Sequence, residues 1–397
     1  MHADRTRGVH MKIVLFANTD WYLYNFRLST ALQLLSQGIE VVMVSPRGDF
    51  HERFGTHGIG WRELPMDRAS LNPVSEIGVL RNLVALLREE SPDLLHSFTL
   101  KCAVYGALAA RVAKVPAVVN AVTGLGYVFC SDRLKARMLR PVVSILMRST
   151  LGQGHSRVIL QNCDDAAAFQ SMRLAPTKNI RLIRSSGVNT NRFVPGQRPG
   201  GGRSPLRVLL AARLVWEKGI QEYIDASRLL KQKGRNIEFL LAGTPDPGNP
   251  RSATREQATG WHEAGDVTWL GHVDDMAGLL RTIDVMALPS YYREGVPKSL
   301  IEAAASGVAL VTTDLPGCRE VVTADGEDGL YVKPRSAQSL ADALARLDDD
   351  RQLLMNLGTR ARQKAMSDFD EKVVVQRTCD VYTELVRLPV GNLVAVE

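Results

Sequence analysis

Short runs of apolar residues alternate with longer amphipathic stretches along the 397-residue chain. The short runs predict strands, and the stretches of ten or more residues between them predict helices. In the first half we expect strands at residues 12–17, 40–45, 94–96, 117–121, 158–160 and 180–183. In the second half we expect strands at residues 207–212, 237–242, 267–270, 284–288 and 308–312. Strands separated by helices favour parallel, doubly wound sheets, so we expect an α/β protein with two Rossmann-like domains facing a central cleft.

A segment rich in glycine and proline marks the expected border between the two domains. It is PGQRPGGGRSP at residues 195–205, and it has no periodicity, which is typical of a linker. We therefore expect an N-terminal domain at residues 11–194 and a C-terminal domain at residues 206–370. Residues 1–10 contain no apolar signal region and are expected to form a disordered lead-in.

The composition is that of a globular protein, with 45% apolar and 23% charged residues. No stretch reaches the roughly 18 uncharged apolar residues that a membrane span needs. The five cysteines are odd in number and scattered, which excludes a disulfide framework and a CxxC metal site and suits a reducing cytoplasm.

The charge is uneven, because residues 1–195 carry a net charge of +10 and the remainder −3. Residues 132–151, DRLKARMLRPVVSILMRSTL, form a basic amphipathic stretch within the positive half. Its cations are Arg133, Lys135, Arg137, Arg140 and Arg148. Such a helix either lies on an anionic membrane surface or packs on the domain with a solvated face, and the positive half favours the membrane.

The most informative segment is residues 291–320, YYREGVPKSLIEAAASGVALVTTDLPGCRE. Glu294 and Glu302 are separated by seven residues and bracket a helix start. Gly307 ends this helix, and an apolar run at residues 308–311 predicts a buried strand. Glu294 therefore lies in the loop before the helix, and Glu302 lies inside it.

The start of this helix is a candidate phosphate site. Gly295 and Pro297 lie just ahead of it, and the N–H groups of Lys298, Ser299 and Leu300 are expected to point out of the helix N-terminus. A nucleotide-sugar pocket can be built from one carboxylate for sugar hydroxyls, a group of amides for a diphosphate and a second carboxylate for ribose. This segment offers all three.

The segment resembles, nearly residue for residue, the donor-site signature of family 4 glycosyltransferases, which are retaining enzymes of the GT-B fold. The sequence PGCRE at residues 316–320 is similar to the branch that acts in bacterial surface-polysaccharide and lipid-linked oligosaccharide synthesis. The resemblance implies that Glu294 holds the donor sugar and Glu302 the ribose. It also implies that a tail helix at residues 371–397 crosses back to the N-terminal domain.

Arg213 and Lys218 follow the first strand of the second domain, in AARLVWEKG. A loop at this place binds phosphates in doubly wound folds, and two cations neutralise a diphosphate without a metal. Two solvated cations are the alternative, but the pair resembles the Arg-x4-Lys donor motif of the family. We therefore expect Arg213, Lys218 and Glu294 to act in catalysis, with no metal and no cofactor beyond the UDP-sugar co-substrate.

The resemblance also implies that the backbone of Gly271 and Val273 holds the nucleobase. The full set of residues expected to bind the donor is Arg213, Lys218, Gly271, Val273, Glu294, Gly295, Val296, Pro297, Lys298, Ser299, Leu300 and Glu302.

In the first domain, His96 ends a strand and is either packed or in contact with the acceptor. Thr123 stands where many members of the family have a histidine near the donor sugar, and a threonine is no general base at neutral pH. The loop after the first strand lacks the paired glycines of many relatives, and its polar groups are Asn18, Asp20, Asn25 and Arg27. Asn18, Asp20, His96 and Thr123 are the candidates for the acceptor side.

We therefore expect a retaining glycosyltransferase that moves a sugar, an N-acetylhexosamine or a hexose, from a UDP-sugar to a polyprenyl-diphosphate-linked saccharide. Such an enzyme would be cytoplasmic and bound peripherally to the inner face of the plasma membrane. One alternative is a nucleotide-sugar 2-epimerase, which shares the architecture. Another is a nucleic-acid-binding module, suggested only by the isoelectric point of about 9.2, because its basic residues follow no known motif.

Overall fold

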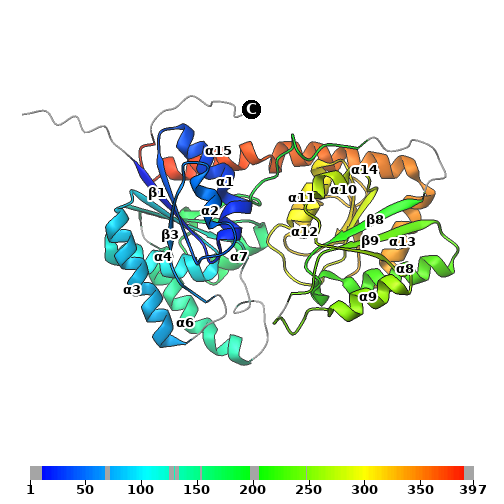
Figure 1. The fold of residues 1–397 in the computed structure, drawn as a ribbon, viewed down its shortest axis with the longest axis horizontal. Helices are drawn as coiled ribbons and strands as arrows, with labels where there is room; N and C mark the ends of the chain where they lie inside the picture. The colour runs from blue at the N-terminus through cyan, green and yellow to red at the C-terminus, as the bar shows by residue number, and fades with distance from the viewer. Residues whose placement is uncertain are drawn as a thin grey trace, which may run out of the picture. The chain divides into compact units, whose positions relative to one another are not determined.

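The computed structural model describes residues 11–67, 72–124, 129, 134–152, 154–196, 205–246 and 248–388. These residues form two compact units (Figure 1). The first unit contains the chain up to Ser186 and again from Val374, and the second contains Gly187–Val373. The expected lead-in and residues 197–204 of the expected linker lie outside the described residues.

The first unit is built on a parallel sheet, in which seven strands of the described chain follow the order β3-β2-β1-β4-β5-β6-β7. The strands are β1 (Lys12–Phe16), β2 (Glu40–Ser45), β3 (Gly60–Glu63), β4 (Leu94–Phe98), β5 (Ala117–Val122), β6 (Ser156–Leu160) and β7 (Ile180–Leu182). The helices are α1 (Asp20–Ser36), α2 (His51–Gly55), α3 (Pro73–Glu90), α4 (Leu100–Ala113), α6 (Leu134–Leu151), α7 (Cys163–Ser171), the short η1 (Thr177–Asn179) and α15 (Glu371–Thr383).

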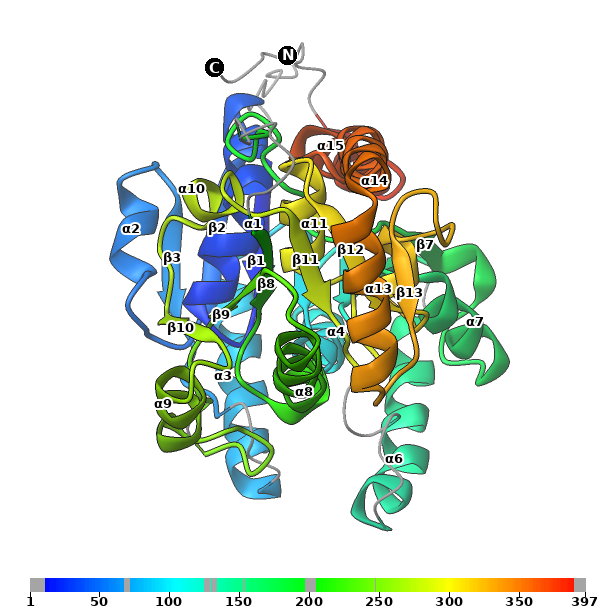
Figure 2. The same ribbon diagram turned by 90° about the vertical axis from the view of Figure 1, so that its right-hand side faces the viewer.

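Apolar cores cover both faces of this sheet. Buried residues of α1, α2 and α15 pack on one face, and those of α3, α4, α6 and α7 pack on the other (Figure 2). Helices on both faces of a parallel sheet explain why the strands read as continuous apolar runs.

The second unit repeats this scheme with a parallel sheet in the order β10-β9-β8-β11-β12-β13. The strands are β8 (Leu206–Ala211), β9 (Ile237–Ala242), β10 (Thr268–Gly271), β11 (Val285–Leu288), β12 (Ala309–Thr313) and β13 (Leu330–Val332). The helices are η2 (Trp216–Lys218), α8 (Ile220–Gln232), α9 (Arg255–Glu263), α10 (Met276–Leu280), α11 (Lys298–Ala305), α12 (Cys318–Val321), α13 (Ala337–Asp349), α14 (Arg351–Lys364) and η3 (Ala365–Phe369). One face is covered by α8, α9 and α13, and the other by α10, α11, α12 and η3.

The predicted architecture of two doubly wound, parallel α/β units is confirmed, whereas three details of the prediction are wrong. The edge strands β3 and β13 were missed, because β3 is largely exposed and β13 has three residues. The amphipathic stretch at residues 25–37 predicts a helix that starts near residue 25, but α1 begins at Asp20, because the Thr19 side chain caps it there by accepting the Tyr22 N–H at 3.1 Å.

The borders between the units differ from those expected at residues 194 and 371. Residues from Gly187 onward belong with the second unit, because the Val188 N–H donates to the Phe369 carbonyl (2.8 Å) and the Glu371 N–H donates to the Val188 carbonyl (2.9 Å). The tail returns to the first unit from Val374 onward.

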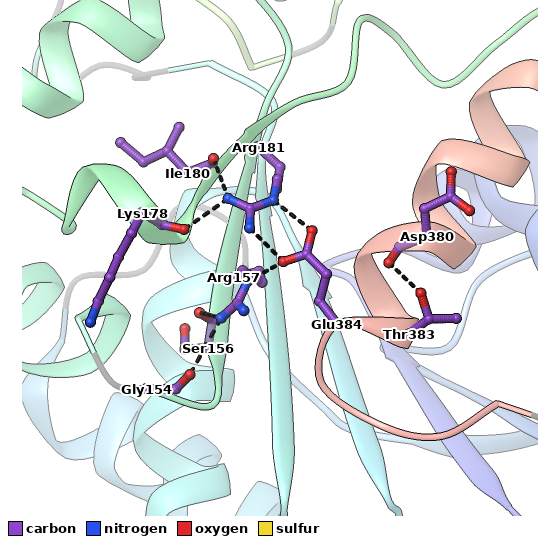
Figure 3. Close-up of polar contacts among 9 residues, drawn as sticks. All are labelled: Gly154, Ser156, Arg157, Lys178, Ile180, Arg181, Asp380, Thr383 and Glu384. Carbon is purple, nitrogen blue, oxygen red and sulfur yellow. Dashed lines mark hydrogen bonds and ion pairs between the residues drawn. The ribbon is translucent and has the colours of Figure 1, made fainter.

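Helix α15 is fixed to the first sheet by polar contacts at its end (Figure 3). Glu384 accepts Arg157 Nε at 2.6 Å and Arg181 Nε at 2.7 Å, from the neighbouring strands β6 and β7. The hydrogen bond from Arg181, together with Arg157, lowers the pKa of Glu384. Within the described part of the chain, no helix is both long and apolar enough to cross a bilayer.

Candidate active site

The second sheet has a topological switch point between β8 and β11. The chain continues from β8 to β9 on one side, and from β11 to β12 on the other. Ligands of doubly wound folds bind at the carboxyl ends of the strands at such a point. Two loops meet there, residues 212–219 after β8 and residues 289–297 after β11. They carry Arg213, Lys218 and Glu294.

Backbone contacts hold these two loops together. The Tyr291 N–H donates to the Glu217 carbonyl at 3.0 Å, and Ser290 Oγ lies 2.9 Å from the same oxygen. Gly219 has a φ of +77°, and a Cβ at this position would lie 2.2 Å from the Pro289 carbonyl oxygen. Only a glycine permits so close an approach in this conformation.

Lys218 and Glu294 form an ion pair at the centre of the site. Lys218 Nζ donates to Glu294 Oε1 at 2.6 Å, and the Ser290 hydroxyl donates to the same oxygen at 2.9 Å. The two charged side chains are 19% and 15% exposed. The pair therefore lies at a partly enclosed surface, where it remains accessible to a ligand.

The loop after β12 supports Glu294 from the other side. The Glu294 N–H donates to the Pro316 carbonyl at 3.1 Å. A Cβ at Gly317, whose φ is +85°, would lie 1.8 Å from the Gly295 carbonyl oxygen. The PGCRE segment thus contributes a proline carbonyl that accepts the Glu294 N–H and a glycine that lets the loop after β12 contact the loop after β11.

Arg213 lies in the same loop as Lys218 but contacts a different partner. Its NH1 donates to Asp246 Oδ2 at 2.5 Å, and its side chain is 64% exposed. Asn249 Nδ2 also donates to this oxygen, at 3.1 Å. Arg213 is therefore held at the rim by the loop after β9, apart from the Lys218–Glu294 pair.

Glu302 lies in the middle of α11, as the sequence predicted. Burial of the carboxyl group raises its pKa to about 7, against the attraction of Lys298 and Arg192. At neutral pH this group is therefore divided between its charged and neutral forms, although a ribose needs the carboxylate as acceptor.

The N-terminus of α11 offers fewer free donors than the sequence predicted. The Leu300 N–H donates to the Pro297 carbonyl at 3.2 Å, and the Leu300 side chain is fully buried. Lys298 Nζ donates to the Gly187 carbonyl at 3.1 Å. Val296 packs half-buried against the core, and Ser299 is half-buried at the first turn of the helix.

Gly271 and Val273 flank the loop that follows β10, as expected. Both residues are half-buried, and Val273 packs against the core of the second unit. His272 is largely exposed and lies 3.3 Å from Asp274 Oδ1. The backbone of this loop is at the same carboxyl edge of the sheet as the other donor candidates, since β10 is parallel to β9.

Two of the four candidates for the acceptor side lie at the carboxyl edge of the first sheet. Asn18 follows β1 and Thr123 follows β5, and both are half-buried. The other two are structural. Asp20 Oδ2 accepts the N–H groups of Phe50 and His51, at 2.8 and 3.0 Å, and fixes that loop.

His96 is packed in the core with 1% of its surface exposed. Its Nδ1 lies 2.6 Å from the Tyr382 hydroxyl, and its ring is 4.0 Å from that of Phe98. Burial, with a smaller effect of Arg27, lowers its pKa well below the ordinary value. Of the two expectations for His96, the packed one fits this environment, because no surface is left for an acceptor.

Ser290 and Glu217 are site residues that the sequence did not indicate. Ser290 is fully buried and orients Glu294 through its hydroxyl, whereas Glu217 provides the carbonyl that joins the loops. Their one signal is their position, two residues after β11 and one residue before Lys218. Across the described residues, no group of three or more His, Cys, Asp or Glu side chains is arranged to hold a metal ion.

Two family models match the chain, one on each unit. The model described as "Glycosyl transferase 4-like" matches residues 12–161, and the one described as "Glycosyl transferases group 1" matches residues 205–350. The second match spans the loops that carry Lys218 and Glu294.

Relatives support these matches over the full length. An N,N'-diacetylbacillosaminyl-diphospho-undecaprenol alpha-1,3-N-acetylgalactosaminyltransferase of Campylobacter jejuni is 30% identical, over 95% of this chain and 100% of the relative. An Escherichia coli UDP-Gal:alpha-D-GlcNAc-diphosphoundecaprenol alpha-1,3-galactosyltransferase is 23% identical, over 80% of this chain and 82% of the relative.

Solved structures agree in fold. Anabaena HepE in complex with UDP and glucose has a TM-score of 0.75 at 20% identity, covering 95% of this chain and 100% of that one. A glycosyltransferase of Rickettsia africae has a TM-score of 0.77 at 16% identity, covering 96% and 99%. With the Lys218–Glu294 site in place, the chain belongs to the group 1, family 4-like glycosyltransferases of the GT-B fold, as its donor signature indicated.

Proposed function

We propose that this glycosyltransferase moves an N-acetylhexosamine or a hexose from a UDP-sugar to a polyprenyl-diphosphate-linked saccharide. The observation that carries the proposal is the Lys218–Glu294 ion pair at the switch point of the second unit. The acceptor class is supported by the two relatives whose names specify undecaprenol diphosphate. The UDP complex of a structural relative supports the donor class.

In this proposal Lys218 binds the donor diphosphate while it holds Glu294. An ammonium group has three N–H donors, of which one is directed at Glu294, so donors remain for phosphate oxygens. Arg213 adds a second cation from the rim once it leaves Asp246. Because both charges face the leaving group, they stabilise the negative charge that develops on UDP in the transition state.

Glu294 is the group proposed to hold the donor sugar through a hydroxyl. Its Oε1 is occupied by Lys218 and Ser290, and this orients the carboxylate. Bond cleavage sends the electron pair of the C1–O bond to the β-phosphate oxygen. The acceptor oxygen then attacks C1 from the same face, and its proton passes to that phosphate oxygen, which gives retention of configuration.

We further propose that the enzyme works without a metal. Lys218 and Arg213 supply the positive charge that a divalent cation provides in other transferases. The protein is also proposed to bind the cytoplasmic membrane surface peripherally, because the acceptor carries a lipid.

One stripe of α6 gives structural support to the membrane proposal. Leu134, Met138, Val142 and Ile145 follow a helical spacing and are between 55% and 72% exposed. Arg137, which is exposed, and Arg140 lie between them along the helix. An apolar stripe flanked by cations is the pattern of a helix that lies in an anionic membrane interface.

A binding assay tests the donor assignment. In the presence of EDTA, isothermal titration should give UDP binding to the native protein, and Lys218→Gln should weaken it by at least tenfold, because a charged hydrogen bond is lost. Arg213→Gln should have a smaller effect, since its side chain is more exposed. Binding that EDTA abolishes and manganese restores would contradict this account.

A further inference from the structure

The first unit has a switch point of its own, to which the proposed function assigns no residue. It lies between β1 and β4, because the chain runs outward through β2 and β3 and then returns to the other side of β1. The carboxyl ends of β1 and β4 therefore form the expected ligand edge of this unit. Phe98 ends β4 there, and α1 begins four residues after β1 ends.

Arg27 of α1 is buried at this edge, with 5% of its surface exposed. Its carbon Cζ lies 4.3 Å from the ring centroid of Phe98 and 5.6 Å from that of Tyr22. NH2 donates to the Tyr22 hydroxyl at 2.9 Å, whereas Nε is enclosed and has no hydrogen-bond partner. Of its five N–H groups, one thus donates to an acceptor of the described chain.

The described residues provide no carboxylate for this guanidinium. Asp20 of the same helix directs its oxygens at the N–H groups of Trp21, Phe50 and His51. Two titratable groups near Arg27, His96 and Tyr382, provide no counter-ion for it. Burial is the reason, since it lowers the pKa of His96 and raises that of Tyr382.

A buried charge without a counter-ion is costly, so a bound anion would stabilise this arrangement. Stacking on Phe98 fixes the plane of the guanidinium, and the planar donor fork matches the oxygens of a phosphate. A carboxylate would also fit a fork, but the proposed substrates carry diphosphates. Two substrates of the proposed reaction carry a diphosphate, the donor nucleotide and the lipid-linked acceptor.

We propose that Arg27 binds a diphosphate, and that this is the diphosphate of the lipid-linked acceptor. The inference rests on the proposed function, in which Lys218 of the second unit receives the donor diphosphate. It adds a binding residue that selects acceptors by their linkage to a prenyl diphosphate rather than by their sugar.

The test compares Arg27→Met with a matched control, Arg53→Met. Arg53 also stacks on two rings, Phe50 at 4.7 Å and Tyr24 at 5.6 Å, but it is exposed. Calorimetry on UDP-saturated protein measures the binding of geranyl diphosphate, with geraniol as the phosphate-free ligand. Arg27→Met should weaken geranyl diphosphate binding at least tenfold, and Arg53→Met should leave it unchanged.

A second readout separates binding from packing. Because Arg27 is an unpaired buried cation, Arg27→Met should leave the thermal unfolding midpoint unchanged or raise it. A lower midpoint with unchanged geranyl diphosphate binding would make Arg27 a packing residue and overturn the proposal. If Arg27→Met does not fold, Arg27→Lys is the second variant, because it keeps the charge without the planar donor fork. Arg27→Lys should still lose most of the affinity for geranyl diphosphate. Full affinity in Arg27→Lys would refute the role proposed for the guanidinium fork.

The two sources of diphosphate give different results. Loss of UDP affinity in Arg27→Met, with geranyl diphosphate binding intact, would assign the site to the donor and refute the acceptor assignment. If the native protein binds neither geranyl diphosphate nor lipid-linked acceptors, the proposed function itself fails. If Arg27→Met binds geranyl diphosphate and lipid-linked acceptors as tightly as the native protein does, the proposed function stands and only the role of Arg27 is refuted.

Discussion

Lys218 and Glu294 form an ion pair, and this pairing fixes the position of both side chains at a partly enclosed surface. The pair is neutral as a whole, so its cost of partial burial is smaller than that of either charge alone. A diphosphate would add negative charge next to Lys218 and take up its remaining donors. The proposed donor would therefore bind next to a carboxylate that Ser290 and Lys218 already orient.

Replacing Glu294 by glutamine tests the role of its charge. Glu294→Gln should lower the turnover rate by 10²- to 10³-fold, about 3–4 kcal/mol of transition-state stabilisation, because a charged hydrogen bond to the donor sugar is lost. UDP affinity, measured by calorimetry, should stay equal or rise, since Lys218 loses its competing anion. Glu327→Gln, which removes an exposed partner of Arg360 in the same unit, is the control. Turnover close to that of the native protein in Glu294→Gln would refute the role.

The predicted contact of Glu302 with the ribose would make nucleoside binding dependent on pH. Its pKa of about 7 leaves mostly the neutral form at pH 6, whereas the ribose hydroxyls need the carboxylate. Uridine, which has no phosphate to titrate, should therefore bind about tenfold more weakly at pH 6 than at pH 8. Glu302→Gln should bind weakly at both values. A flat profile in the native protein would show that Glu302 does not contact the ribose.

The same pKa has a consequence for stability. Glu302 has an ordinary pKa near 4.5 in the unfolded chain and a pKa of about 7 in the folded protein. Between these two pH values the folded protein keeps a proton on Glu302 that the unfolded chain has released. The contribution of this group to the free energy of unfolding is therefore full below about pH 4.5 and is lost as the pH rises through about 7.

At the scale of residues, the sequence indicated the charged candidates for donor binding but not the residues that contact them. Glu294, Glu302 and Lys218 belong to a spaced signature, so they could be found without coordinates. Ser290 could not, because a serine at a strand end has no distinctive pattern. The roles of His96 and Arg27 were open as well, since burial depends on contacts with Tyr382 and Phe98 that are distant in sequence.

Among the elements, α6 is distinguished by apolar side chains that nothing in the described chain covers. Single exposed apolar residues are common on protein surfaces, but four at helical spacing form a continuous stripe. Arg133 of the predicted basic helix lies outside the described residues, and the described cations of α6 include Arg137 and Arg140.

A vesicle assay tests this stripe. The double variant Leu134→Ser, Met138→Ser should reduce flotation with phosphatidylglycerol vesicles by at least about tenfold, because each side chain loses apolar area that would enter the interface. The matched control is Met355→Ser, Met366→Ser, which removes two exposed methionines from the second unit. UDP binding should be unaffected in both. Equal flotation of the native protein and the α6 variant would make α6 a packed surface helix.

The elements of the central sheets could be predicted because strands buried on both faces are apolar throughout. The edge strand β3 carries Trp61, Arg62 and Glu63 in partly or fully exposed positions, so it has no apolar run. The start of α1 could not be predicted from the sequence for a different reason. Its first turn contains Trp21 and Tyr22, and the Thr19 cap that defines the helix start has a weaker signal than the apolar spacing further along.

At the scale of the molecule, the two units differ in net charge, although the ligands proposed for both are anionic diphosphates. The net charge of the first unit, Met1–Ser186 with Val374–Glu397, is +8, which suits a unit proposed to meet an anionic lipid diphosphate and a membrane surface. The second unit, at −1, is proposed to bind its nucleotide by a few placed cations instead. The fold was predictable from periodicity, whereas the borders between units were not, because residues 187–193 pair with the chain near residue 370 rather than with their sequence neighbours.

The central claim is sugar transfer to a lipid-linked acceptor, and one product analysis tests it most directly. Purified protein, a panel of UDP-sugars and an undecaprenyl-diphosphate-linked saccharide would be incubated in EDTA, and the lipid product analysed by mass spectrometry and NMR. The account predicts one sugar added per UDP released, with an α linkage from an α-configured donor. An epimerised UDP-sugar formed without acceptor, or a β-linked product, would contradict it.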